Sequence, residues 1–350
     1  MTARKSNESV GEAFPEIVTL DDVAAAQARI RAHLPQPSPL RRYAPLDAAV
    51  GRNIRVWVKH ENHLPTNSFK VRNALSAMTA LSDEQRARGV VAATRGNHGL
   101  GLAYAGAALG VPATICVPRG NNPEKNEAIV GYGATLIEEG RDYDESAEVA
   151  ASLVKSRGLH LVHSTNDRQV IAGAGTLTIE MIEQAPPSLG AIVYAVGGGS
   201  QAASGLAVAR ALRPEVPVFG VQAAGASAIH DSWHRGVAVA KPEARTFADG
   251  LATRGVYEFT FPALRAGLAG FVLVSEEEIA EACRLLLRTT HNLAEGAGAA
   301  GLAGLMAIAE SGRLDGKDVA IVLSGGNVDL RTLRWILESS ALETGKVVAS

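Results

Sequence analysis

The chain has 350 residues, 47% of them hydrophobic, and its 34 basic residues nearly balance its 36 acidic ones. This length and composition allow about two domains with buried cores. The balanced charge gives no field that would favour nucleic acid or an anionic membrane surface, so small molecules are the expected partners.

Other general features point to an ordinary globular enzyme or binding protein. The two cysteines, Cys116 and Cys283, cannot form a disulfide framework. No apolar run reaches the ~20 residues that a membrane helix needs. The first fifteen residues are polar and mixed in charge, unlike a secretory signal, so a cytoplasmic location is expected.

Short runs rich in valine and isoleucine alternate along the chain with longer, alanine-rich amphipathic segments. This alternation is typical of parallel sheets covered by helices on both faces, so the predicted fold class is α/β. The predicted strands, too many for one comfortable sheet, are 54–59, 90–93, 113–117, 135–138, 159–163, 191–196, 216–221, 271–274 and 319–323. The predicted helices include 20–34, 71–81, 99–109, 144–156, 170–184, 201–212, 276–290, 297–311 and 330–342.

The first segment with chemical content is Thr66-Asn67-Ser68-Phe69-Lys70-Val71-Arg72-Asn73-Ala74, in which Lys70 opens a predicted helix. A lysine attacks an aldehyde only as the neutral amine, so a Schiff-base lysine needs a site that disfavours its ammonium form. The positive end of the helix dipole works in that direction. Taken alone, the segment also fits an amphipathic helix with a surface lysine.

Three further segments follow predicted strands. Thr94-Arg95-Gly96-Asn97-His98-Gly99 allows close approach of a ligand at Gly96, although glycine and asparagine are also common in plain turns. Gly197-Gly198-Gly199-Ser200 exposes backbone N–H groups at a helix start, which suits a phosphate, and it lacks the G-x-G-x-x-G spacing of dinucleotide folds. Ser324-Gly325-Gly326-Asn327 follows the last strand.

Together and in this order, the four segments resemble the β-family (fold type II) of pyridoxal-phosphate enzymes, most closely its serine/threonine dehydratase branch. The resemblance runs from about residue 21 to about residue 337. It implies a tryptophan synthase β-like fold of two lobes, with the cofactor in the cleft between them. The large cofactor-binding domain would comprise 1–58 and 158–350, and the small substrate domain 59–157 would be inserted in it.

The resemblance also implies roles for individual residues. Lys70 would be the catalytic residue, bound to pyridoxal 5'-phosphate and acting as general base on the α-proton. The Ser324 hydroxyl would face the pyridine nitrogen, giving a weak electron sink that favours prompt loss of a β-leaving group. Asn97 would bond the phenolic oxygen. The implied cofactor-binding residues are Phe69, Lys70, Asn97, Gly197, Gly198, Gly199, Ser200 and Ser324, and the implied substrate-binding residues are Thr94, Arg95, Gly96, Asn97 and His98.

Several positions depart from the family pattern. Asn73 and Ser200 each replace a glycine, and the hydroxyl of Ser200 could add a phosphate contact. Arg95 stands where related racemases carry a serine base, and an arginine that stays protonated cannot serve as that base. Gln222 and Ala228 stand where the same relatives hold a divalent metal with acidic residues, so no metal is expected.

Arg95 and Glu295 keep two explanations each, and Asp249 has one. Arg95 either points to solvent or pairs with a second acidic group of the substrate, as in a 3-hydroxyaspartate-like amino acid. Glu295, in Glu295-Gly296-Ala297-Gly298, either lies near the cofactor or a monovalent cation, or is a plain carboxylate at a helix N-terminus. Asp249, in Asp249-Gly250-Leu251-Ala252, lies near the cleft, and packing is its expected role.

The predicted function is a lyase that removes water and ammonia from a β-hydroxy-α-amino acid such as threonine, serine or a β-substituted serine, giving a 2-oxo acid. The alternatives are a cysteine-synthase-like β-replacement enzyme, a racemase, or a catalytically silent protein that binds small molecules. A homodimer is a family expectation. The sequence does not identify the β-substituent.

Overall fold

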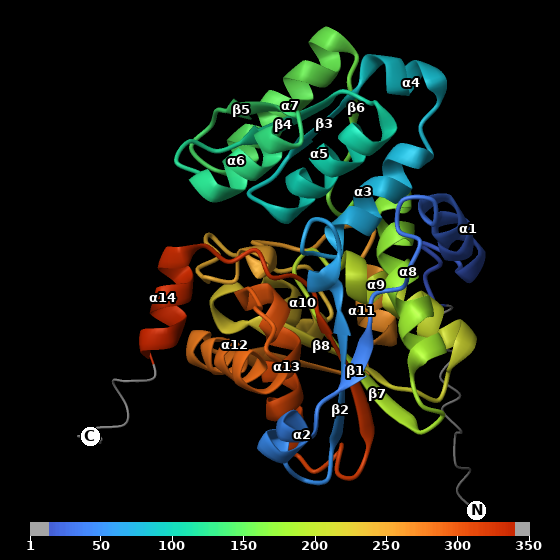
Figure 1. The fold of residues 1–350 in the computed structure, drawn as a ribbon, viewed down its shortest axis with the longest axis vertical. Helices are drawn as coiled ribbons and strands as arrows, with labels where there is room; N and C mark the ends of the chain where they lie inside the picture. Colours follow the sequence, from blue (N-terminus) through green and yellow to red (C-terminus); the bar gives the residue numbers. More distant parts are fainter. Residues whose placement is uncertain (1–13, 340–350) are drawn as a thin grey trace, which may run out of the picture.

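The computed structural model describes residues 14–339, which form two lobes, each built around its own sheet (Figure 1). The larger sheet has the order β1(Leu40–Arg42), β2(Arg55–His60), β10(Asp318–Leu323), β7(Leu189–Ala195), β8(Val218–Ala223) and β9(Gly270–Val274). The smaller sheet has the order β5(Thr135–Glu138), β4(Ala113–Val117), β3(Val90–Ala93) and β6(His160–Leu161). All neighbouring strands are parallel except β1 and β2. The predicted α/β fold class is thus confirmed.

Helices cover both faces of each sheet, as parallel strands require. In the larger lobe, Val319, Ile321 and Leu323 of β10 pack toward α2(Ala44–Val50), α12(Glu276–Thr290) and α13(Gly296–Ala309). Ala320 and Val322 point to the opposite core, beside α8(Arg168–Gln184), α9(Ser200–Leu212), α10(Ala228–Arg235) and α11(Phe261–Gly267). This alternation explains why the strand is apolar along its whole length.

The smaller sheet has the same construction. One of its faces packs on α3(Lys70–Thr79), α5(Asn97–Leu109) and α6(Pro123–Gly131), and the other on α7(Tyr143–Arg157). The remaining helices of the described residues are α1(Leu20–Ile30), α4(Asp83–Arg88) and α14(Leu330–Glu338), with short 3₁₀ turns η1(Glu61–His63), η2(Ala224–Ala226) and η3(Asp249–Leu251). The end of the predicted helix 330–342 lies outside the described residues.

The sheets differ from the expectation at a few places. The antiparallel strand β1 and the helices α2, α4, α6, α10 and α11 were not predicted. The domain boundaries stay a prediction. The pairing of β6 with β3 favours a second boundary after Leu161 rather than after residue 157.

A buried ionic cluster fastens α3 to the larger lobe. The Arg72 guanidinium, 1% exposed, donates to both oxygens of Glu61 on η1 and both oxygens of Glu180 on α8, over 2.7–3.1 Å. Lys59 of β2 adds a bond of 2.8 Å to Glu180. Burial alone would lower the pKa of Arg72, but the two carboxylates more than offset it and raise that pKa. Because Arg72 lies two residues after Lys70, the cluster fixes the start of α3.

Both cysteines are buried and unpaired. Cys116 lies in β4 and Cys283 in α12, and burial raises the pKa of their thiols to about 11 and about 12. Thiolates are the reactive form of cysteine, so both side chains are inert at neutral pH.

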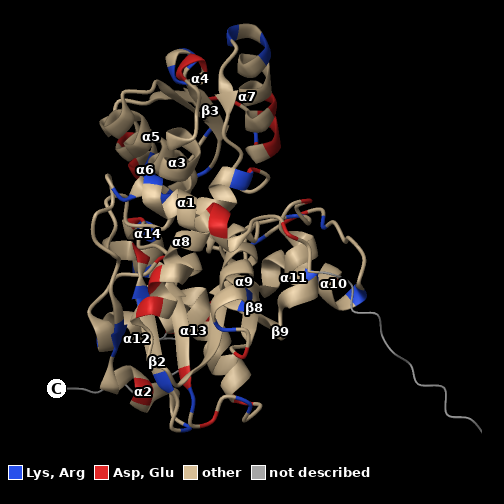
Figure 2. Ribbon diagram, turned by 90° about the vertical axis from the view of Figure 1, so that its right-hand side faces the viewer, with Lys and Arg blue, Asp and Glu red and all other residues tan. Residues whose placement is uncertain are grey.

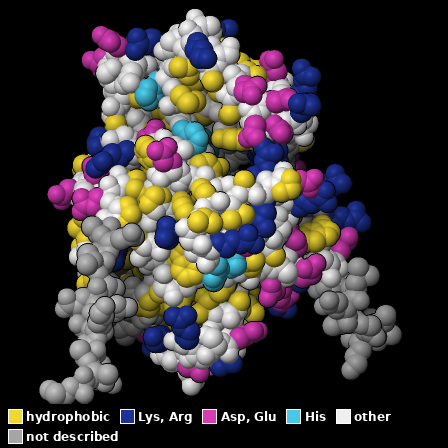
Figure 3. Space-filling view, turned by 180° about the vertical axis from the view of Figure 1, so that it is seen from behind, with side chains coloured by type: hydrophobic (Ala, Val, Ile, Leu, Met, Phe, Trp, Pro, Cys, Tyr) yellow, Lys and Arg dark blue, Asp and Glu magenta, His cyan; other side chains and the backbone are white. Residues whose placement is uncertain are grey.

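Charged side chains of both signs are interspersed over both lobes (Figure 2). The face opposite to that of Figure 1 mixes basic, acidic and apolar side chains in the same way (Figure 3). Among residues 14–339, no helix combines the length and the apolar composition needed to cross a bilayer.

Candidate active site

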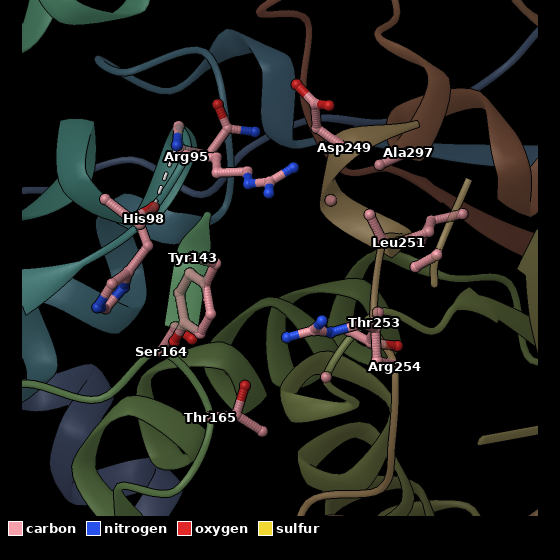
Figure 4. A pocket seen from close by; sticks show the side chains of 18 of the residues that line it. Arg95, His98, Tyr143, Ser164, Thr165, Asp249, Leu251, Thr253, Arg254 and Ala297 are labelled. Carbon is pink, nitrogen blue, oxygen red and sulfur yellow. Dashed lines mark hydrogen bonds between the residues drawn. The ribbon is translucent and has the colours of Figure 1, made fainter. Parts of the chain in front are cut away.

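A cavity of about 960 Å³ lies between the two lobes and is lined by every residue that the sequence predicts for the site. The smaller lobe contributes Thr94, Arg95, Gly96, Asn97 and His98. The larger lobe contributes the glycine loop 197–200 and Ser324, and Lys70 lies where the lobes meet. Figure 4 shows part of this cavity from close by. The strands β3, β7 and β10 all end at it, as expected for ligand sites of open parallel sheets.

Lys70 is the first residue of α3, and the two residues before it are bonded to the segment that follows β10. The Phe69 N–H donates to the carbonyl of Ser324 over 3.0 Å, and Ser68 forms an isolated β-bridge with Gly325. Burial in the cavity wall lowers the pKa of Lys70 to about 8, against the opposing negative charge of Glu295. Such an amine is neutral far more often at physiological pH than an ordinary lysine.

The glycine loop leads into the N-terminus of α9. Gly199, at φ +90°, is the residue before the helix, whose first backbone N–H groups have no acceptor within it. A Cβ atom at Gly198 would lie 2.3 Å from Thr165 Oγ1, and one at Gly197 would lie 2.0 Å from the carbonyl oxygen of Gly250. The loop therefore presents bare backbone at the positive end of a helix, which is a suitable site for a phosphate.

A second helix N-terminus, that of α5, faces the same cavity. Its residue before the helix is Gly96, whose N–H donates to Thr94 Oγ1 over 3.1 Å. Asn97 is the first residue of α5, and its amide is held at both ends. Nδ2 donates to Glu295 Oε1 over 2.6 Å, and Oδ1 accepts from Asn327 Nδ2 over 2.8 Å. These bonds connect the small lobe to the starts of two large-lobe segments.

Glu295 immediately precedes α13 but does not cap it through its side chain. Its carboxyl lines the cavity and bonds Asn97, so it is more than a plain carboxylate at a helix start. Burial raises the pKa of Glu295 to about 7, although Lys125 and the bond from Asn97 act in the opposite direction.

Ser324 and His98 are both nearly buried at the edge of the cavity. Ser324 Oγ makes one long bond, 3.3 Å, to the carbonyl of Ala297, and a hydroxyl of this kind can turn toward another partner. His98 Nε2 lies 3.0 Å from the carbonyl of Val162, and burial lowers the pKa of its ring to about 3. The imidazole is thus neutral, and its bond to Val162 ties it to the small lobe.

Two ion pairs across the cleft were not predicted. Lys125 of α6 bonds Asp249 of η3 over 2.8 Å, and Arg254 pairs with Asp144 of α7. Gly250 packs against the glycine loop, in agreement with the role expected for this segment, whereas Asp249 itself joins the lobes. The paired residues are more than 100 positions apart, so no sequence pattern relates them.

Other wall residues missed by the sequence include Tyr143, Ser164 and Thr165, which lie along one side of the cavity in Figure 4. Gln201 follows Ser200 and is 4% exposed, with Nε2 buried and without a partner among the described residues. The only sequence signal at Gln201 was its place directly after the glycine loop.

Comparisons with known proteins agree with this geometry. The family model described as pyridoxal-phosphate dependent enzyme matches residues 32–325. The L-threonine ammonia-lyase of Thermotoga maritima is 38% identical over 335 residues, which are 95% of this chain and 81% of that protein.

Solved structures of the same architecture are also similar. The processed form of threonine deaminase isoform 2 from Solanum lycopersicum has a TM-score of 0.83 and 30% identity, covering 92% of this chain and 94% of that chain. Serine racemase from Dictyostelium discoideum has a TM-score of 0.82 and 33% identity, covering 90% of this chain and 100% of that chain.

Proposed function

Because the chain belongs to the family of pyridoxal-phosphate dependent enzymes, we propose that it is an ammonia-lyase that converts a β-hydroxy-α-amino acid, such as threonine, to a 2-oxo acid. The observation that carries this proposal is the position of Lys70. Its amine, with a lowered pKa, lines one cavity together with the N-termini of α5 and α9. The comparisons confirm the family, the fold class, the cofactor and the β-elimination reaction predicted from the sequence.

The residues of the cavity fit pyridoxal phosphate. The glycine loop packs so closely against Gly250 and Thr165 that a Cβ at Gly197 or Gly198 would displace it, and in this position its backbone N–H groups at the N-terminus of α9 would hold the phosphate. Lys70 would hold the aldehyde carbon, and the Ser324 hydroxyl would meet the pyridine nitrogen. Asn97 Nδ2 donates one of its two hydrogens to Glu295, so the other is free for the phenolic oxygen.

When bound, the cofactor withdraws electrons from the α-carbon of the amino acid. Lys70 then takes the α-proton as general base, a role that its lowered pKa supports. The backbone N–H groups of Arg95 and Asn97 would bind the substrate carboxylate at the positive end of α5, since those of Thr94 and Gly96 already donate to the Cys116 carbonyl and to Thr94 Oγ1. The ion pairs across the cleft hold the two lobes together around these groups.

The chain departs from a racemase at the residue that would act on the opposite face of the substrate. Arg95 stands there, and its guanidinium stays protonated and cannot take a proton. A β-replacement enzyme would release little 2-oxo acid without an added nucleophile, which gives a direct way to separate it from a lyase.

The test compares Lys70→Ala with the matched control Lys155→Ala, which removes an exposed lysine of α7. The wild type and the control should bind pyridoxal phosphate with a visible absorbance band and release 2-oxo acid from threonine or serine. Lys70→Ala should lose the band, and its turnover should fall by ~100-fold or more. A colourless wild type, or a Lys70→Ala protein that keeps full turnover, would refute the proposal.

Two further expectations remain part of the proposal. A homodimer is tested by the mass of the purified protein in light scattering. A cytoplasmic location is tested by cell fractionation with an antibody against the chain.

A further inference from the structure

We propose that the substrate carries a second carboxylate on its β-substituent and that Arg95 binds it, as for a 3-hydroxyaspartate-like amino acid. This inference rests on the proposed lyase reaction and narrows its substrate class. It starts from the charges that line the cavity.

Arg95 lies in the loop between β3 and α5, and its side chain is exposed along the cavity wall. In Figure 4 the guanidinium extends from the loop into the space between Asp249 and Arg254. Within residues 14–339, no carboxylate forms a salt bridge with it and no hydrogen bond uses its donors. Its five N–H donors therefore have no partner among the described residues.

The neighbouring cations differ from Arg95 because each has a carboxylate of its own. Apart from Lys70, the other basic residues of the cavity wall pair as follows: Lys125 with Asp249, Lys241 with Asp231, Arg245 with Glu243, and Arg254 with Asp144. Among the described residues, Arg95 is thus the arginine of the cavity wall whose guanidinium has no carboxylate partner.

The acidic residues of the wall are engaged as well. Asp142 accepts the first N–H groups of α7, and Glu295 accepts from Asn97. Asp249, which is labelled beside the guanidinium of Arg95 in Figure 4, is bound to Lys125. Among the described residues no acidic side chain of the wall is left for Arg95, so we assign its negative partner to the ligand.

The α-carboxylate of the substrate already has a place at the N-terminus of α5, directly after Arg95 in the chain. A second carboxylate on the β-carbon would extend from there into the cavity, which at about 960 Å³ has room for it. The planar guanidinium matches a carboxylate through two parallel hydrogen bonds, which is both stronger and more directional than a single contact. Threonine and serine carry no second carboxylate that could bind this guanidinium.

Selectivity is measured as the ratio of kcat/KM for threo-3-hydroxyaspartate to kcat/KM for L-threonine, in the wild type, in Arg95→Gln and in Arg245→Gln. Arg245 is the matched control because it lines the same cavity but has its own carboxylate. The wild type should favour the dicarboxylate, and Arg95→Gln should reduce the ratio by about 10- to 100-fold, the range expected for a charge-assisted bond. The control should leave the ratio within about threefold of the wild type.

A second measurement does not depend on turnover. L-Aspartate and L-alanine differ by one carboxylate and lack a β-hydroxyl, and their binding is followed by the change in the visible band of the bound cofactor. Arg95→Gln should weaken aspartate binding at least tenfold more than alanine binding. Equal losses would mean that Arg95 binds the α-carboxylate instead, and would overturn the inference.

The two levels of failure are distinguishable. Turnover of threonine or serine without preference for the dicarboxylate would overturn the role of Arg95 and leave the lyase proposal intact. A preference for O-phosphoserine over 3-hydroxyaspartate would overturn the carboxylate as the second group. If none of the hydroxyamino acids released a 2-oxo acid, the lyase proposal itself would fail.

Discussion

Removing the guanidinium of Arg72, in the variant Arg72→Met, is expected to destabilise the folded protein by about 3–5 kcal/mol, the range for breaking a buried ion pair from one side. The two carboxylates that it serves, Glu61 and Glu180, are 0% and 8% exposed. With Lys59 they form a cluster of two positive and two negative charges, so the variant leaves a buried net charge of about −1.

The hydrogen bonds that remain in Arg72→Met show which carboxylate loses more stabilisation. Glu180 would keep its bonds from Lys59, at 2.8 Å, and from the Ser38 N–H, at 3.1 Å. Glu61 would keep a bond of 2.5 Å from the Ser38 hydroxyl, which cannot replace a charge. The double variant Arg72→Met/Glu61→Gln restores the balance of charge. It should therefore be less destabilised than the sum of the two single variants by about 1–3 kcal/mol.

Urea unfolding followed by circular dichroism measures these differences, with Arg334→Met as the control. Arg334 forms an exposed pair with Glu338, with side chains 78% and 63% exposed, and its loss should cost no more than about 1 kcal/mol. Equal effects for Arg72→Met and Arg334→Met would refute the reasoning from burial. Additive effects of Arg72→Met and Glu61→Gln would show that their charges are not coupled.

Two further predictions concern the cavity. Gly198→Ala should raise the dissociation constant for pyridoxal phosphate about tenfold or more, because its Cβ would lie 2.3 Å from Thr165 Oγ1. Gly131→Ala, which has open space around it, is the control and should leave the constant unchanged. Titration of the cofactor-free protein measures both constants, and unchanged binding by Gly198→Ala would contradict the close packing. Burial raises the pKa of Glu295 from 4.5 to about 7, so the folded state holds a proton that the unfolded chain loses between these values, and the contribution of this group to stability falls as pH rises through that window. In Glu295→Gln the free energy of unfolding should fall less steeply with pH than in the wild type, as measured by urea unfolding of the cofactor-free proteins at several pH values. Identical pH profiles for the two proteins would exclude the raised pKa of Glu295.

Strands and helices with strong local patterns were predictable from the sequence. The predicted strands 90–93, 113–117 and 135–138 coincide with β3, β4 and β5, because apolar runs bounded by turn residues carry the signal locally. The strand β1, by contrast, has three residues with the pattern Leu-Arg-Arg and pairs with β2 at the edge of the sheet. Its identity as a strand comes from that pairing, which no local pattern records.

The same distinction holds for the cavity. Segments that present glycine or a lysine at a strand or helix end can be recognised singly, and the structure brings them together around one cavity. The Asn97–Glu295 bond and the Lys125–Asp249 pair join residues 198 and 124 positions apart. Their partners are set by how the two lobes meet, and the shifted pKa of Glu295 follows from that arrangement, so sequence could only leave its role open.

The inert thiols of Cys116 and Cys283 make the native chain a ready background for site-specific labelling. Because both sulfur atoms are shielded and held protonated, one cysteine introduced on the surface of each lobe would be the sole pair to react with a maleimide dye or spin probe. Energy transfer or dipolar spectroscopy between the two labels could then follow the opening and closing of the cleft as amino acids enter and products leave.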